Sequence, residues 1–217
     1  MQVLRDKHHA FDPLWHVQLV LLGVIGLQLA LPGDLVLLPK FVLPALEVLC
    51  MLVLQLVTPK KAVFESHLRR LAVMALLGLV LLANVSSLQL VLQALANADK
   101  HTAPHLLLAA LNIYVTNIVM FALFYWEMDS GGPGSRRAAE AGERDFLFPQ
   151  QNLGYQVKPT WYPTFLDYLY VAVTNGTAFS PTDTLPLTRR AKLLMGLQAL
   201  VSLLVVVLVA ARAVNVL

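Results

Sequence analysis

The stretch Trp161-Tyr-Pro-Thr-Phe-Leu-Asp-Tyr-Leu-Tyr-Val-Ala-Val-Thr-Asn-Gly-Thr-Ala-Phe-Ser-Pro-Thr-Asp-Thr-Leu-Pro-Leu-Thr-Arg-Arg190 decides the fold of this chain. A short apolar run begins at Pro163, a residue that suits a first helical turn, and stops at 174–176, a helix-ending Thr-Asn-Gly triplet. The 12 residues 163–174 would form a helix of about 18 Å, too short for a hydrocarbon core of about 30 Å. A polar segment and a long apolar run to Leu217 follow.

Two arrangements fit this stretch. In the first, 163–174 is a half-helix that enters the bilayer, and the polar segment returns to the same side, as in a re-entrant pore loop. In the second, the helix continues to Phe179 as a short sixth span. The loop 58–70 is strongly basic, so the positive-inside rule places it in the cytoplasm. Re-entry would keep the basic residues of 189–192 on that same side, and the charge rule therefore favours it.

The composition sets the protein class. Of the 217 residues, 58% are hydrophobic and 13% are charged, with a mean hydropathy of +0.67, whereas soluble domains carry about 25% charged residues. We therefore expect an all-α, polytopic membrane protein whose partner is the lipid bilayer. The net charge of +3 is too small to indicate a nucleic-acid partner. The single cysteine, Cys50, excludes an intrachain disulfide, and the charged leader 1–13 does not resemble a cleavable signal.

Apolar runs divide the chain into its expected parts. Residues 1–126 are predicted to form a four-helix transmembrane bundle, 127–160 a flexible, solvated loop, and 161–217 a pore-like hairpin of half-helix, turn and transmembrane helix. This gives five full transmembrane helices plus a re-entrant half-helix, or six transmembrane helices in the alternative arrangement. The expected spans of the bundle are 14–31, 35–57, 71–96 and 104–126.

The polar segment supplies candidate ligands for a cation. The carboxyl end of a half-helix carries roughly half a negative charge, and oxygen ligands suit alkali or hard divalent cations rather than zinc or copper. An ordinary helix stop followed by a capping turn is the alternative interpretation. The predicted ion pathway comprises Thr174, Asn175, Gly176, Thr177, Ser180, Thr182 and Asp183.

Three charged residues, Glu47, Asp167 and Arg212, fall within predicted helices and need partners. A charge near the membrane centre costs at least ~2.5–3.5 kcal/mol. A tie between Arg212 and either Glu47 or Glu127 is one solution, and Arg212 could also reach an interface as a terminal anchor. A proton- or ion-coupled site at Glu47 is the functional alternative. Asn84, Ser87, Asn112, Thr116 and Asn117 are expected to hydrogen-bond neighbouring helices, with a substrate-lining role as the alternative.

Residues 165–186 resemble the pore helix and filter of two-helix potassium channels. In this resemblance Thr177 stands for the filter threonine, Asp183 for the aspartate and Pro186 for the proline that follows. Ser180-Pro-Thr182 occupies the Gly-Tyr-Gly positions, which is a departure, because the φ of Pro181 is fixed near −65°. The resemblance implies a pore-like hairpin but not a potassium-type carbonyl ladder.

A second resemblance covers nearly the whole chain. The runs that carry it are Phe124-Tyr-Trp-Glu-Met-Asp-Ser-Gly-Gly-Pro133, Asp145-Phe-Leu-Phe-Pro-Gln150, Asp167-Tyr-Leu-Tyr170, Thr174-Asn-Gly-Thr-Ala-Phe-Ser-Pro-Thr-Asp183 and Ala211-Arg-Ala-Val-Asn-Val216. In these runs the chain is similar to an uncharacterised family of actinobacterial integral membrane proteins. The resemblance implies a bacterial inner-membrane location and a functional half at 145–215, without supplying an activity.

These patterns favour a channel- or transporter-like protein for a small cation. One hairpin cannot enclose a pore, so a homo-oligomer is expected. A non-conducting accessory or structural membrane protein is the alternative. An enzyme is not expected, because the six histidines all lie in the amino-terminal half and no Gly-x-Ser-x-Gly or His-Glu-x-x-His motif occurs. No cofactor is expected.

Overall fold

The computed structural model describes residues 15–29, 41–56, 67–96, 103–133, 135–136, 141–152, 161–178 and 183–216, and this part of the chain is mostly helical. Three of its helical segments, Arg70–Gln93, His105–Gly131 and Arg189–Ala210, are long and apolar enough to cross a bilayer, which is compatible with a membrane protein. The helices are α1 (Trp15–Leu29), α2 (Val42–Leu56), α3 (His67–Ala96), α4 (Ala103–Met128), α5 (Pro149–Asn152), α6 (Phe165–Ala178) and α7 (Arg189–Val216).

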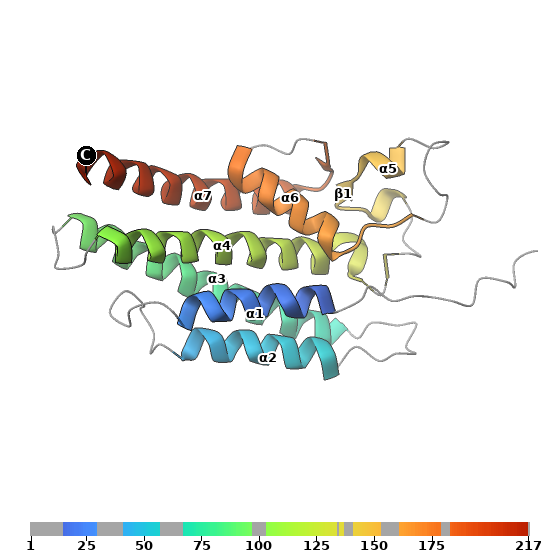
Figure 1. Ribbon diagram of the computed structural model, residues 1–217. Coiled ribbons are helices and arrows are strands. Elements are labelled where there is room, and N and C mark those ends of the chain that lie inside the picture. Colours follow the sequence, from blue (N-terminus) through green and yellow to red (C-terminus); the bar gives the residue numbers. More distant parts are fainter. Residues whose placement is uncertain are drawn as a thin grey trace, which may run out of the picture.

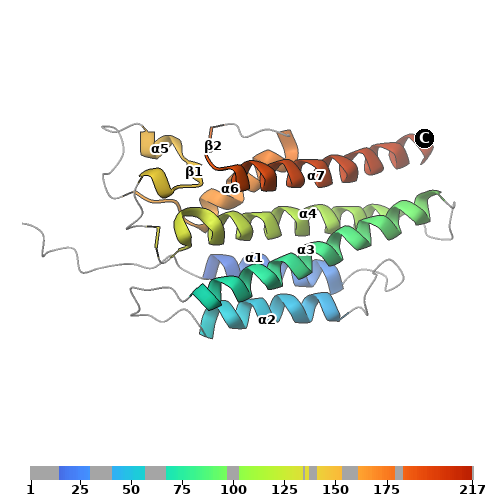
Figure 2. The same ribbon diagram turned by 180° about the vertical axis from the view of Figure 1, so that it is seen from behind.

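Each of the first four helices runs antiparallel to the one before it in the chain (Figure 1). Gln28 at the end of α1 bonds Glu47 near the start of α2. Arg70 at the start of α3 donates to the carbonyl of Met128 at the end of α4. Figures 1 and 2 show that α1 and α2 stop well short of the far ends of α3, α4 and α7. The hairpin of α1 and α2 therefore ends part of the way along the bundle.

Helix α4 is the centre of the bundle, because α1, α3, α6 and α7 all pack against it. Its carboxyl-terminal half is buried on almost every side, and its sequence is accordingly apolar all round rather than along one face. Aromatic rings dominate there: Trp126 meets Phe165 of α6 edge-to-face, and Phe121 contacts Tyr125. A separate apolar cluster of α3, α4 and α7 fills the far end of the bundle.

Helices α6 and α7 run in the same direction. Along α6, Ala172 contacts Gln198, and Gly176 lies beside Ser202 one turn further along α7. Both helices begin at the end of the bundle that carries α5 and the strand β1 (Phe146–Leu147) (Figure 1). The chain is back at this end by β2 (Leu185–Pro186), which pairs antiparallel with β1.

Helix α6 reaches only part of the way along its neighbours. It starts level with Trp126 and has reached Ile118 by Gly176, about two turns of α4. Helix α6 therefore covers only part of the length of its neighbours, and the chain is back at its starting end by β2.

The predicted bounds of this half-helix are wrong. Helix α6 begins at Phe165 and continues without a break to Ala178, so the expected stop at 174–176 does not occur. Two residues of that triplet have tertiary partners. Asn175 donates a hydrogen bond to the Met195 carbonyl of α7, and Gly176 packs against α4 and α7. Tertiary partners thus override the helix-ending tendency of the local sequence.

The prediction that 127–160 is a solvated loop is also wrong for part of the segment that the structure describes. Asp129, Asp145 and Phe146 are fully or almost fully buried. The segment forms the 3-10 turns η2 (Asp129–Gly131) and η3 (Ala141–Glu143), the strand β1 and the short helix α5. The glycines and charges that suggested flexibility instead build a tight turn and buried hydrogen bonds.

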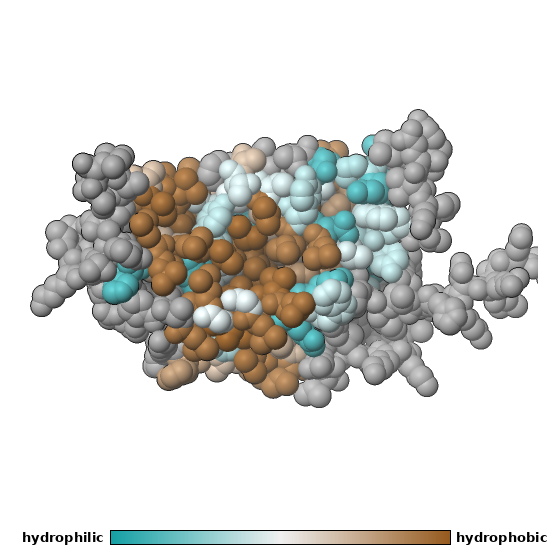
Figure 3. Space-filling model, viewed as in Figure 1, coloured by the Kyte–Doolittle hydropathy of each residue, from teal (hydrophilic) through white to brown (hydrophobic). Residues whose placement is uncertain are grey.

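The viewed face of the molecule is apolar across its middle (Figure 3). More polar residues gather toward the end that carries α5 and β1. Exposed leucines and valines of α7, such as Leu193 and Leu200, contribute to the apolar surface of the molecule. An apolar middle with a polar end matches a bundle that sits in lipid.

Candidate functional site

The carboxyl end of α6, here called its tip, was predicted to offer oxygen ligands to a cation. In the structure its threonine hydroxyl groups form hydrogen bonds within the helix. The Thr174 hydroxyl donates to the carbonyl of Tyr170, and the Thr177 hydroxyl donates to the carbonyl of Val173, at 3.0 and 2.8 Å. Such back-bonding is the usual behaviour of threonine inside a helix. Thr177 and Ala178 nevertheless remain exposed, so α6 ends at the surface of the described part of the chain, part of the way along the bundle.

Behind the tip lies a buried polar cluster that we call the mid-bundle cluster. Its hub is Gln198 of α7, which is completely buried. The Gln198 Oε1 accepts from Tyr125 OH at 2.6 Å and from Asn175 Nδ2 at 2.8 Å, and its Nε2 donates to the Ala172 carbonyl at 2.7 Å. One side chain therefore joins α4, α6 and α7. Asn175, predicted as an ion ligand, contributes its amide hydrogens to this tie.

Gly176 acts as a close-packing residue in this structure. A Cβ atom at this position would lie 3.2 Å from Ser202 Oγ and 3.4 Å from Ile118 Cγ1, closer than almost all real contacts. Small residues at such points let helices in a membrane approach each other closely. Glycine thus allows the tip of α6 to enter the angle between α4 and α7.

A row of buried polar groups on α4 extends past the tip of α6 toward the far end of the bundle. Asn117 donates to Ser202 at 3.1 Å, and Asn84 of α3 donates to the Ile113 carbonyl at 3.0 Å. Among the described residues, Asn112 Nδ2, Thr116 Oγ1 and Asn117 Oδ1 have no hydrogen-bond partner. Unsatisfied buried polar atoms are costly in an apolar medium.

A second network, which we call the basal network, holds the amino-terminal end of α6. Asp129 follows α4 in a turn with positive φ at Ser130 (55°) and Gly131 (83°). Its buried carboxylate accepts the backbone N–H of Asp145 at 2.8 Å and the hydroxyl of Tyr168. Arg136 lies 3.9 Å from the same carboxylate and 4.6 Å from the centre of the Tyr168 ring.

Asp145 ties the loop to the start of α7. Its carboxylate has no exposed surface, while the side chain of Arg190 is 54% exposed. Arg190 donates from Nε to Oδ1 at 2.6 Å and from its terminal nitrogen to Oδ2 at 2.7 Å, which is the strong two-point geometry of a guanidinium–carboxylate pair. Thr188 adds a third bond at 2.5 Å. The basal network therefore holds the first turns of α6, through Tyr168, and the start of α7, through Arg190.

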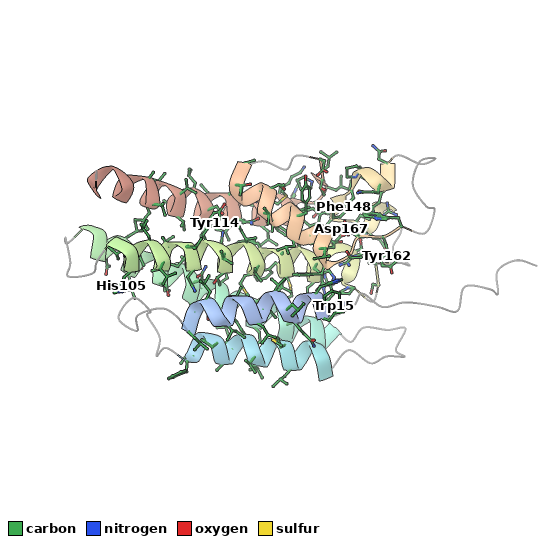
Figure 4. All side chains as sticks on the ribbon, viewed as in Figure 1. Trp15, His105, Tyr114, Phe148, Tyr162 and Asp167 are labelled. Carbon is green, nitrogen blue, oxygen red and sulfur yellow. The ribbon has the colours of Figure 1, made fainter. Side chains whose placement is uncertain are left out.

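The remaining predicted positions have different fates. Asp167 is not a buried charge without a partner, since it caps α6 by accepting the backbone N–H of Thr164 at 2.7 Å and its hydroxyl at 2.8 Å. Figure 4 places Asp167 at the end of the bundle opposite His105. Asp183 is exposed and lies two residues before β2. The predicted positions outside the described residues are Ser180, Thr182 and the side chain of Arg212.

Glu47 is buried, as the sequence predicted, with 1% of its surface exposed. Among the described residues its hydrogen-bond partner is Gln28, whose Nε2 donates to Glu47 Oε1 at 2.6 Å. The predicted ties of Arg212 to Glu47 or Glu127 stay predictions, because the Arg212 side chain is outside the described part of the chain.

The residues that carry both networks were largely missed by the sequence argument. Gln198 and Ser202 stand one turn apart in the otherwise apolar stretch 193–211 of α7. Isolated polar residues of this kind were available signals, because they mark interhelical contacts in membrane bundles. Comparison of the chain with protein-family models, with curated proteins and with solved structures finds no match, so its own geometry must carry the functional interpretation.

Proposed function

We propose that this protein is a channel- or transporter-like membrane protein for a small cation and that it works as a homo-oligomer in a bacterial inner membrane. The observation that supports this most is the end of α6. The helix stops part of the way along the bundle, and its last residues, Thr177 and Ala178, are exposed.

An exposed helix end at membrane depth needs a polar surrounding. Free carbonyl groups cost several kcal/mol each in hydrocarbon, and such backbone is tolerated only when it is covered by protein or lines a water-filled cavity. A ring of identical subunits with the α6 ends facing a common axis would satisfy this requirement. The similarity of the hairpin to potassium-channel pore loops supports the same arrangement.

The sign of the charge at this end favours cations. The carboxyl end of α6 carries roughly half a negative charge. The exposed carboxylate of Asp183 lies on the returning segment, and the uncharged groups of Asn112, Thr116 and Asn117 continue beyond the tip. This combination provides a charged entrance followed by neutral polar groups.

The distribution of basic residues predicts the orientation. Nearly all of the described lysines and arginines lie at the end of the bundle that carries α5 and β1, so the positive-inside rule places this end in the cytoplasm. Helix α7 then carries the carboxyl terminus to the opposite side. The residues concerned are Arg69, Arg70, Arg136, Arg144, Arg189, Arg190 and Lys192, with Arg212 toward the other end.

We expect a carboxy-terminal alkaline phosphatase fusion to be active in the periplasm and a carboxy-terminal green fluorescent protein fusion to be dark. An amino-terminal fluorescent fusion should stay bright, because α1 starts at the cytoplasmic end. A bright carboxy-terminal fusion would contradict re-entry and would support six full spans.

Purified protein in liposomes tests conduction. We expect flux of a monovalent or divalent cation above that of empty vesicles, and a reduction of roughly two- to five-fold for Asp183→Asn, because a unit charge a few ångströms from a hydrated path contributes about 0.5–1 kcal/mol. Glu143→Gln removes another exposed carboxylate at the same end and should leave the flux unchanged. If wild-type flux equals that of empty vesicles, the alternative of a non-conducting accessory protein replaces this proposal.

A further inference from the structure

Gln28 and Glu47 form a buried pair between α1 and α2 that belongs neither to the mid-bundle cluster nor to the basal network. Their exposed fractions are 5% and 1%. Gln28 Nε2 donates to Glu47 Oε1 at 2.6 Å, whereas Gln28 Oε1 and Glu47 Oε2 have no partner among the described residues. The pair therefore contains one hydrogen bond and two buried acceptor oxygens that lack a donor.

A single proton supplies what this pair lacks. A carboxamide and a protonated carboxyl group are complementary, because each has one donor and one acceptor and together they form two parallel hydrogen bonds. A proton on Glu47 Oε2 would turn that oxygen into a donor toward Gln28 Oε1. An ionised carboxylate would leave a charge and two unsatisfied oxygens in an apolar place, which is far more costly.

The surroundings offer no described charge to compensate an ionised Glu47. The helices packed against α2 are α1 and α3. Their described titratable or charged side chains are His16 and Arg70, which both lie in the first turn of their helices. Gln28 lies in the last turn of α1, whereas His16 and Arg70 lie at the end of the bundle where α1 begins.

We propose that Glu47 and Gln28 form a proton-binding site, in which the Glu47 carboxyl group holds a proton at neutral pH and shares it with the Gln28 carbonyl oxygen. The ligand of this site is a proton alone. The inference does not depend on cation conduction, since it rests on the hydrogen-bond geometry of α1 and α2.

Infrared spectroscopy of the whole purified protein in lipid at neutral pH tests the proposal. We expect the carbonyl band of a protonated carboxyl group in the wild type and its loss in Glu47→Gln, whose amide can still form both hydrogen bonds and should preserve the fold. Asp145→Asn is the matched control, because Asp145 is equally buried but paired with Arg190, and this variant should keep the band.

A second variant keeps the test decisive if Glu47→Gln does not fold. Gln28→Leu removes the donor to the carboxyl carbonyl, so the band should shift to higher frequency. The proposal is overturned if the wild type has no such band, or if the band is the same in the wild type and in whichever of the two variants folds. Flux measurements do not enter this test, so its failure and the failure of conduction are distinguishable.

Discussion

Replacing Gln198 with leucine is expected to destabilise the protein by about 2–4 kcal/mol. The substitution keeps a similar volume but leaves Tyr125 OH and the Ala172 carbonyl without their partners and removes one of the two acceptors of Asn175 Nδ2. Hydrogen bonds between membrane helices contribute about 0.6 kcal/mol on average and up to about 1.7, so three of them account for this range. Equilibrium unfolding in mixed detergent micelles measures the change.

The neighbouring Leu197 provides the matched control, because 46% of it is exposed. Leu197→Ala should change the free energy of unfolding by less than about 1 kcal/mol. The double variant Tyr125→Phe with Gln198→Leu should cost less than the sum of the two single variants, since both remove the same bond. Additive losses would show that Gln198 does not join α4 to α7.

Replacing Arg190 with glutamine is expected to cost about 2 kcal/mol. Breaking a buried ion pair typically costs 3–5 kcal/mol, and the value is discounted here because Arg190 is 54% exposed. Asp145→Asn should cost less, about 1 kcal/mol, because the arginine left behind can be hydrated whereas an unpaired Asp145 has no access to water. The asymmetry between the two variants is the main prediction, and unfolding in mixed micelles measures it.

Arg189 is the control for this pair, because it is exposed and adjacent in sequence. Arg189→Gln should change the stability by less than about 0.5 kcal/mol. The double variant Asp145→Asn with Arg190→Gln should resemble Asp145→Asn alone, because the buried charge has been removed. If Arg190→Gln proves no more harmful than Arg189→Gln, the ion pair does not stabilise the fold.

The long helices could be predicted from the sequence, because hydrophobic runs and their lengths report directly on bilayer dimensions. The expected spans 71–96 and 104–126 lie close to α3 and α4. The expectation that α6 is too short to cross also agrees with its 14 residues. These features depend on local composition, which a single sequence displays.

The partners of the polar residues could not be predicted in the same way. Thr174, Asn175 and Gly176 form a helix stop by local propensity, and only the positions of Gln198 and Ser202 on α7 make them a packing surface. Asp145 falls in the stretch predicted as a flexible, solvated loop, because its partner, Arg190, lies 45 residues away in the sequence. Long-range pairing decides both cases.

The same separations have a consequence for biogenesis. The contacts that hold the carboxy-terminal half together join residues 39, 45 and 85 positions apart, as in Tyr168–Asp129, Arg190–Asp145 and Asn117–Ser202. Two of these three contacts require α7, the last of the described helices to be synthesised. Helix α6 also packs against α4, so it can dock before α7 is made, but its bonds to Gln198 form only once α7 has been synthesised.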